Sequence, residues 1–200
     1  MKKLFDFAFS IAGLVILSPL FLVISVWIKL DSKGSVFYKQ VRVGKNSSDF
    51  KLYKFRTMRT DSDKSGLLTV GGRDPRITGA GYFLRKFKLD ELPQLFNIAA
   101  GEMSFVGPRP EVRKYVDMYN DEQRKVLSVL PGITDVASIK YRNENELLEK
   151  AEDPESYYIE SIMPDKLKLN LDYIEQRSFT NDIKVIFKTL TAITGQKSQK

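Results

Sequence analysis

The hydrophobic pattern separates the first 31 residues from the rest of the chain. Residues 7–28 carry no charge, and this length reaches the roughly 20 residues that a helix needs to span a bilayer. Ser18-Pro19 falls near the middle, where proline removes a helix hydrogen bond and clashes with the preceding turn. Lysines flank both ends, so the positive-inside rule permits both ends to face the same side. The pattern predicts a kinked helix that re-enters one leaflet; the alternatives are a Pro-kinked transmembrane helix and, less favoured, a buried helix of a soluble core.

After residue 31 the pattern becomes mixed and predicts a compact domain. We expect a helix-rich α+β fold: residues 1–31 form the re-entrant helix, 32–195 a compact domain with a small β element, and 196–200 a flexible tail. We expect strands at 35–38 and 50–55, with a turn between them at 44–49. A long loop is expected at 59–80, and helices are expected at 81–87, 93–100, 110–129 and 181–194.

The last of these predicted helices is amphipathic. Ile183, Ile186, Phe187 and Leu190 share one helical face, with Lys184 standing off it. Such a face lies either on a membrane surface or against the core of its own domain. The sequence leaves both alternatives open.

The composition narrows the chemistry before any motif is considered. The chain has no cysteine and no histidine, which excludes disulfides, thiolate sites, serine–histidine triads and the usual transition-metal ligands. Catalysis must rest on carboxylates, amines, guanidinium groups or hydroxyls, and the composition leaves room for an oxygen-bound metal such as Mg²⁺. The 32 basic and 25 acidic residues give a net charge of +7, which is typical of proteins with phosphate-bearing partners or an anionic membrane face.

Asp90 and Glu91 are the candidate catalytic residues. They stand just before Pro93, and proline is favoured in the first turn of a helix. We therefore expect both acids at the positive end of a helix, where free N–H groups favour anions. Adjacent helical side chains diverge by about 100°, so one acid can attack while the other holds a metal. An acidic first turn that merely caps its helix is the alternative for the pair taken alone.

Cations surround this acidic pair along the sequence. Arg109 lies between two prolines, which restrict the residues before them and stiffen the backbone. The planar guanidinium group suits bidentate phosphate binding. Carboxylates among several cations, without histidine, indicate phosphoryl-transfer chemistry. The candidate phosphate- and substrate-binding residues are Lys54, Arg56, Arg76, Arg85 and Arg109.

These stretches resemble the bacterial sugar transferases, the monotopic phosphoglycosyl transferases that begin glycan assembly on a lipid carrier. The resemblance runs in order from about residue 3 to residue 134 and resumes near residues 173–190. The matching segments include Phe5-Asp6-Phe7, Ser18-Pro19, Phe37–Gly44, Leu52–Met58, Asp74–Thr78, Leu89–Asn97, Gly101–Pro110 and Pro131–Thr134.

The resemblance implies a bacterial inner-membrane enzyme whose anchor breaks at Ser18 and Pro19 and whose catalytic domain faces the cytoplasm. It implies a Mg²⁺-dependent ping-pong transfer of a sugar 1-phosphate from a UDP-sugar to polyprenyl (undecaprenyl) phosphate, with release of UMP. Asp90 would be the nucleophile and Glu91 its Mg²⁺-binding or acid–base partner. Lys54 and Arg85 would hold phosphates, and Arg109 would seat the nucleotide.

The departures from the family pattern lie toward the C-terminus. Residues 135–138 read Asp-Val-Ala-Ser where small members often have Gly-Trp-Ala-Gln, and Asn170 stands where an acid is expected. These departures bear on the sugar more than on the reaction. We expect the short form of the family, and the sequence leaves a homodimer open.

Two other classes of function are considered. A catalytically silent membrane-bound scaffold of a glycan pathway is the alternative, and the intact Asp90, Glu91 and Arg109 argue against it. A membrane-anchored nucleic-acid module would need stacking aromatics on a basic surface. No motif supports that module, and nucleic acid is not an expected partner.

Overall fold

The computed structural model describes residues 2–60, 62 and 74–194. The predicted tail at 196–200 and most of the predicted loop at 59–80 lie outside these residues. The helices and strands along the chain are α1 (Lys2–Ile16), α2 (Ser18–Asp31), β1 (Phe37–Val43), η1 (Lys45–Ser47), β2 (Asp49–Phe55), α3 (Gly79–Lys86), η3 (Leu89–Glu91), α4 (Gln94–Ala99), β3 (Ser104–Val106), α5 (Arg113–Val116), η4 (Gln123–Ser128), β4 (Gly132–Thr134), α6 (Val136–Lys140), α7 (Glu144–Glu149), α8 (Pro154–Tyr157), η5 (Tyr158–Ile162), α9 (Met163–Glu175) and α10 (Phe179–Thr194). The predicted helix-rich α+β architecture with a small β element is confirmed.

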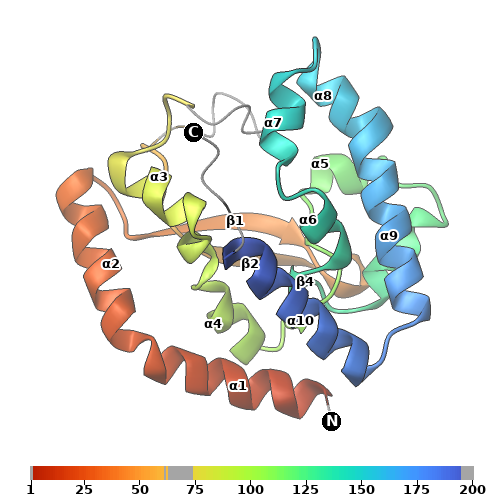
Figure 1. The fold of residues 1–200 in the computed structure, drawn as a ribbon, viewed down its shortest axis with the longest axis horizontal. Helices are drawn as coiled ribbons and strands as arrows, with labels where there is room; N and C mark the ends of the chain where they lie inside the picture. Colours follow the sequence, from red (N-terminus) through yellow and green to blue (C-terminus); the bar gives the residue numbers. More distant parts are fainter. Residues whose placement is uncertain (1, 61, 63–73, 195–200) are drawn as a thin grey trace.

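The two N-terminal helices form a bent arm along one side of the molecule (Figure 1). The helix axis bends by 60° between α1 and α2, and the break coincides with Pro19 at the start of α2. The Ser18 hydroxyl donates to the Val15 carbonyl over 2.8 Å and so satisfies one group that the broken helix leaves open. In the described part of the chain no single helix is long and apolar enough to cross a bilayer, whereas the bent pair together has sufficient length and composition.

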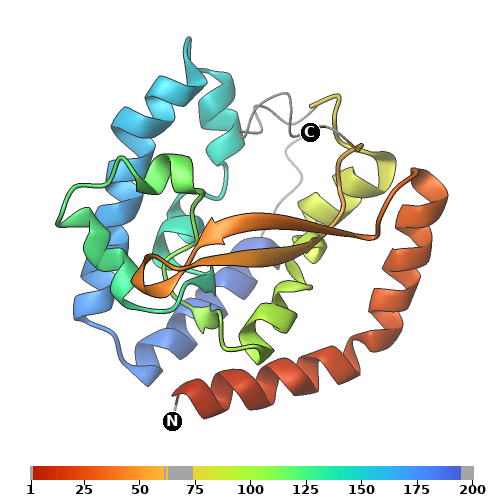
Figure 2. The ribbon, with the colours of Figure 1, turned by 180° about the vertical axis from the view of Figure 1, so that it is seen from behind.

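A twisted hairpin runs from this arm to the opposite side of the molecule (Figure 2). β1 and β2 pair antiparallel from Phe37↔Phe55 to Val43↔Asp49, so β1 is longer than the strand expected at 35–38. The turn holds two non-glycine residues in the left-handed region, Asn46 and Ser47. One face of β2 buries Phe50 and Leu52 in a cluster with Leu95 of α4, which fixes the hairpin against the centre of the domain.

The C-terminal half packs around the far end of the hairpin. β3 and β4 pair in parallel, and the largest core cluster joins residues of α5, η4, α7, η5 and α9. The helix predicted over 110–129 is wrong. The structure has only the short α5 and the 3₁₀ segment η4 there, because the Glu111 carbonyl bonds to the Val43 amide and holds the segment before α5 extended beside β1.

A polar junction ties the end of α2 to the hairpin and to α3. The Arg56 guanidinium donates to the carbonyls of Ile28, Ser32 and Lys33 and to the Ser32 hydroxyl, over 2.5 to 3.3 Å. Ile28 lies in the last turn of α2, and Ser32 and Lys33 follow the helix directly, so Arg56 binds the chain where α2 ends. The Asp31 carboxylate accepts from the Ala80 amide at the start of α3 over 3.1 Å. The end of α2 is therefore bound to two elements that also border the candidate active site.

Two glycines allow the close approaches at this junction. A Cβ on Gly34, whose φ is +126°, would lie 1.9 Å from Arg56 Nη1. A Cβ on Gly81 would lie 2.1 Å from the Thr57 carbonyl oxygen. Any larger residue at Gly81 would push α3 away from the end of β2.

Candidate active site

A cavity of about 530 Å³ opens between the hairpin, the turn before α4, the segment before α5, and helices α7 and α9. Every residue proposed from the sequence for catalysis or substrate binding lines it, although these residues come from widely separated parts of the chain. They are Lys54, Arg56, Arg76, Arg85, Asp90, Glu91 and Arg109. The structure thus brings the predicted set together, and the role of each member stays a prediction.

The Asp90–Glu91 pair lies on a single 3₁₀ turn, η3, rather than on the first turn of α4. Lys88 precedes the turn in the left-handed conformation with φ of 55°, and α4 begins only at Gln94. Both carboxylates are buried, at 7% and 9% exposure. Because neighbouring side chains on such a turn point in different directions, the two acids have different surroundings.

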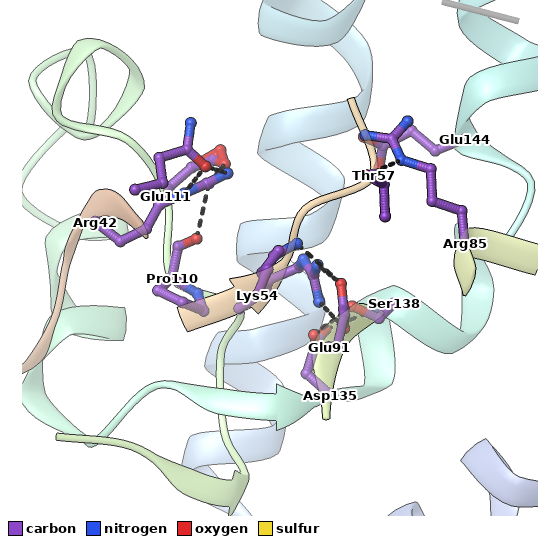
Figure 3. Close-up of polar contacts among 12 residues, drawn as sticks. Arg42, Lys54, Thr57, Arg85, Glu91, Pro110, Glu111, Asp135, Ser138 and Glu144 are labelled. Atoms are coloured by element: carbon purple, nitrogen blue, oxygen red, sulfur yellow. Dashed lines mark hydrogen bonds and ion pairs between the residues drawn. The ribbon is translucent and has the colours of Figure 1, made fainter. Parts of the chain in front are cut away.

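Glu91 is paired with two cationic side chains. Arg109 donates to both of its carboxylate oxygens, and Lys54 Nζ lies 3.1 Å from Oε1 (Figure 3). Burial alone would raise the pKa of Glu91, but the charges of Arg109 and Lys54 outweigh it and hold that pKa well below its usual value. In turn, Glu91 raises the pKa of Arg109. Glu91 is therefore ionised and fixed in position.

Asp90 is buried without such compensation. Its Oδ1 atom has no hydrogen-bond partner among the described residues. Burial, and then the charge of Glu91, raise the pKa of Asp90, and the attraction of Lys54 and Lys88 offsets only part of this rise. An ionised carboxylate with few hydrogen bonds is a better nucleophile than one held in ion pairs, and it can also bind a cation.

Arg85 of α3 and Arg76 of the segment before α3 line the cavity together with Asp90. Arg85 Nε donates to the Thr57 hydroxyl over 3.0 Å; in Figure 3 this contact and the contact of Arg42 with Glu111 lie on opposite sides of Lys54 and Glu91. Arg76 grips the Asp74 carboxylate through Nε and Nη2 over 2.6 to 3.0 Å, and this bond to Arg76 lowers the pKa of Asp74. Burial lowers the pKa of Arg85, which stays cationic because its usual pKa is so high.

Arg56 borders the cavity but directs its donors elsewhere. It is 5% exposed, and its Nη atoms bond to the end of α2 as described above, leaving only Nε without a partner. The structure gives this side chain a place in the junction, and a phosphate contact would require it to leave these bonds.

Several lining residues were not predicted as site residues from the sequence. Gln40 and Arg42 alternate along β1 on the face that Tyr38 also presents, and this period of two could have marked them. No sequence signal marks Glu111 of the segment before α5 or Tyr158 of η5. In residues 135–138, which depart from the family pattern, Asp135 caps α6 by accepting a hydrogen bond from the Ser138 amide. Its charge also helps to raise the pKa of Arg109, after that of Glu91.

Comparison with known proteins identifies relatives that cover nearly the whole chain. The chain is 36% identical over 98% of its length to UDP-N-acetylgalactosamine-undecaprenyl-phosphate N-acetylgalactosaminephosphotransferase of Aeromonas hydrophila. It is 36% identical over 94% of its length to UDP-glucose:undecaprenyl-phosphate glucose-1-phosphate transferase of Klebsiella pneumoniae. It is 35% identical over 96% of its length to exopolysaccharide production protein ExoY of Sinorhizobium fredii.

The chain spans 44% and 39% of the first two relatives but 84% of the third. The model of one family, described as bacterial sugar transferase, matches residues 1–196, nearly the whole chain. The family predicted from the sequence is therefore confirmed: the chain belongs to the bacterial sugar transferases.

Proposed function

We propose that this chain transfers a sugar 1-phosphate from a UDP-sugar to undecaprenyl phosphate or a similar polyprenyl phosphate through a covalent intermediate on Asp90. The observation that carries the proposal is the buried, unpartnered Asp90 oxygen in a cavity lined by Lys54, Arg85 and Arg109. The names of the relatives from Aeromonas hydrophila and Klebsiella pneumoniae support the same donor and acceptor classes.

The chemistry favours a carboxylate over a hydroxyl nucleophile. In the first step an Asp90 oxygen forms a bond to the β-phosphorus while the bond from that phosphorus to the UMP oxygen breaks. The resulting acyl phosphate is a mixed anhydride, so it keeps the reactivity of the donor for the second step. In that step an oxygen of the polyprenyl phosphate attacks the same phosphorus, and the Asp90 carboxylate is released. A serine ester would be far more stable and would trap the sugar phosphate.

The surrounding cations have distinct tasks in this proposal. Arg85 lies on the α3 side of the acidic turn, where it can neutralise the phosphoryl oxygens and the departing UMP. Lys54 and Arg109 hold Glu91, which keeps the turn in one conformation beside the reacting phosphorus. This pre-organisation reduces the rearrangement needed when charge develops.

Magnesium fits these residues as a cofactor that the substrate helps to bind. No group of three or more carboxylate, histidine or cysteine side chains that could hold a metal occurs in the described ranges. Mg²⁺ typically uses one or two carboxylates together with substrate phosphates and water. The unpartnered Asp90 oxygen and the adjacent Glu91 supply that donor set. When bound, the ion would offset negative charge on the diphosphate.

We also propose that α1 and α2 dip into one leaflet of the bacterial inner membrane, with the catalytic domain on the cytoplasmic side. The support is the bend at Pro19 together with the apolar side chains that the arm leaves exposed. α2 buries Ile24 and Ile28 toward the domain and turns its other apolar residues outward. The exposed apolar residues of the two helices include Leu4, Phe7, Phe9, Val15, Ile16, Leu22, Val23, Val26 and Leu30.

Because the chain has no cysteine, single cysteines report this topology without background. Lys3→Cys and Lys33→Cys lie on either side of the apolar arm. In right-side-out vesicles, a membrane-impermeant maleimide is expected to label neither position until the vesicles are opened. Labelling of Lys3→Cys alone in sealed vesicles would instead identify a transmembrane helix.

The function is tested by UMP release. Purified protein with Mg²⁺ and a polyprenyl phosphate is expected to release UMP from at least one of UDP-glucose, UDP-galactose and their N-acetylated counterparts. Without acceptor, mass spectrometry is expected to find a phosphosugar on the peptide that contains Asp90. Asp90→Asn is expected to lower turnover by about a thousandfold or more. Near-normal turnover of that variant would exclude the covalent role, and absence of turnover across a broad donor panel would favour the silent scaffold.

A further inference from the structure

The cavity has a second polar cluster that the proposed phosphoryl transfer does not use. It consists of Gln40 and Arg42 of β1, Glu111 of the segment before α5, and Tyr158 at the start of η5, and we refer to it as the Arg42–Glu111 cluster. η5 is a single turn of π-helix, a distortion that occurs frequently at functional sites. In Figure 3, Arg42 and Glu111 lie on one side of Lys54, and Arg85 lies on the other.

Hydrogen bonds fix the Arg42–Glu111 cluster before any ligand binds. Arg42 donates to Gln40 Oε1 over 2.7 and 3.0 Å and to Glu111 Oε1 over 3.0 Å. Tyr158 donates its hydroxyl to Glu111 Oε2 over 3.1 Å. Burial raises the pKa of Tyr158 well above its usual value, so this hydroxyl keeps its proton. The Glu111 carboxylate is therefore held from both sides.

The cluster keeps capacity for a polar, uncharged ligand. Since Gln40 Oε1 accepts from Arg42, the amide nitrogen of Gln40 is left as a donor, and no described residue accepts from it. Each Glu111 oxygen accepts one side-chain hydrogen bond and has a second lone pair. A fixed donor next to fixed acceptors suits neighbouring hydroxyl groups on a sugar ring.

The cluster lies next to Lys54 along the hairpin and next to Arg109 along the chain. Tyr38 pairs with Lys54 across the hairpin, and Gln40 is the next residue of β1 on the same face. Two residues of a strand span about 7 Å, which is comparable to one sugar ring with its hydroxyls. Glu111 follows Arg109 by two residues in the same proline-stiffened segment. One rigid segment thus contributes to both groups.

Charge and stacking separate the parts of the donor. Lys54, Arg85, Lys88 and Arg109 outnumber Asp90 and Glu91 around the catalytic turn, which favours the diphosphate there. In the cluster, Arg42 is balanced by Glu111, which favours a neutral group. The Tyr158 ring is 3% exposed, with Lys166 Nζ 5.3 Å above it and the Tyr115 ring 5.0 Å away. It therefore offers no open face on which uracil could stack.

We infer that the Arg42–Glu111 cluster is the subsite for the sugar ring of the donor, that it takes an uncharged, hydroxyl-bearing hexose, and that Glu111 rejects sugars with a carboxylate. The inference rests on the proposed function and adds the class of sugar to it. Within the cluster, Gln40 and Arg42 lie in a segment that matches the family, whereas Glu111 and Tyr158 lie outside the matching segments. Sugar choice can therefore differ between relatives that share the reaction.

The test uses two substitutions in the cluster and two matched controls. Glu111→Gln keeps the shape of the side chain and removes its charge; Tyr158→Phe removes one hydroxyl. Asp165 and Tyr141 form a similar hydroxyl–carboxylate bond of 2.7 Å away from the residues that line the cavity, so Asp165→Asn and Tyr141→Phe serve as controls. Thermal unfolding of each variant verifies that it folds.

The main measurement is the ratio of kcat/KM for the best neutral donor to kcat/KM for UDP-glucuronate, together with the inhibition constant of UMP. Glu111→Gln is expected to reduce this preference about tenfold, because the repulsion of a second carboxylate is removed. Tyr158→Phe is expected to lower kcat/KM for the neutral donor, and UMP inhibition is expected to stay within twofold in all variants. The controls are expected to match the original protein.

Two results would overturn the inference while leaving the proposed function intact. If Glu111→Gln weakens UMP inhibition and leaves the donor ratio unchanged, the cluster holds the nucleoside. If neither quantity changes, the cluster is only structural. Failure of the proposed function would look different, because the original protein would then release no UMP from any donor. In that case, calorimetric binding of UDP-glucose and UMP to Asp90→Asn, with and without Glu111→Gln, still decides whether the cluster contacts the sugar.

Discussion

At the junction of α2 with the hairpin and α3, Arg56 is 5% exposed and makes four hydrogen bonds to the end of α2. At the catalytic turn, Asp90 is 7% exposed and leaves a carboxylate oxygen without a described partner. Both are buried charges on elements that border one cavity, yet only the first is compensated. A buried charge with its partners stabilises a fold, whereas a buried charge without them is kept at a cost in stability and is typical of functional sites.

The largest effect on stability is expected from breaking the junction. Arg56→Met keeps most of the side-chain volume but removes the guanidinium donors from the Ser32 and Lys33 carbonyls. We expect the free energy of unfolding to fall by about 2–3 kcal/mol, measured by denaturant titration in detergent. Arg113→Met is the matched control, because Arg113 pairs with Asp49 at 39% side-chain exposure. Its effect is expected to stay below about 1 kcal/mol.

The same variant decides between two roles for Arg56. If Arg56 held a phosphate of the donor, as the sequence predicts, Arg56→Met would raise KM for the UDP-sugar and change stability no more than the control. If it belongs to the junction, the loss of stability comes first, and KM changes little in the protein that remains folded.

Removing the charge of Asp90 at the catalytic turn is expected to have a smaller effect on the free energy of unfolding, and of opposite sign. The folded state raises the pKa of Asp90, so it binds this proton more tightly than the unfolded chain. The stability contributed by protonated Asp90 is therefore fully present below about pH 4, the pKa of an unfolded aspartate. It is lost as the pH rises through the raised pKa. Asp90→Asn removes the charge, and we expect it to be more stable than the original protein by about 1 kcal/mol at pH 7.

The pH dependence checks this comparison. Melting curves of the original protein and of Asp90→Asn are expected to lie close together at pH 4 and to separate as the pH is raised to 7. If Asp90→Asn is less stable than the original protein at pH 7, the folded state stabilises the ionised Asp90 carboxylate instead of destabilising it. The contrast between the turn and the junction would then be wrong.

Local patterns predicted most of the fold and most members of the site. The break at Pro19 and the hairpin follow from proline chemistry and short-range periodicity. The acidic pair, expected in the first turn of the helix at Pro93, lies instead on the 3₁₀ turn before α4. The helix expected over 110–129 failed because the pairing of Glu111 with Val43 is a long-range contact, which a local pattern does not contain.

The members of the site were predicted better than their contacts. Cations next to an acidic pair indicate a phosphate site, but the sequence cannot say which of them are directed toward it. Arg56 lies two residues from Lys54 in the same stretch, yet its guanidinium bonds to the end of α2. Tyr158 reaches the cavity only through the packing of η5 on α5. Both outcomes depend on tertiary arrangement rather than on neighbouring residues.

Gly81 has a consequence for how this enzyme can vary. Its α-carbon faces the Thr57 carbonyl at a separation that leaves no room for one additional carbon atom. The helix that carries Arg85 can approach Thr57 this closely only because Gly81 has no side chain. Alanine at this position would widen the gap across which Arg85 reaches Thr57, without altering any group that performs chemistry. One added carbon atom at a position without catalytic chemistry would therefore change the position of Arg85 in the cavity.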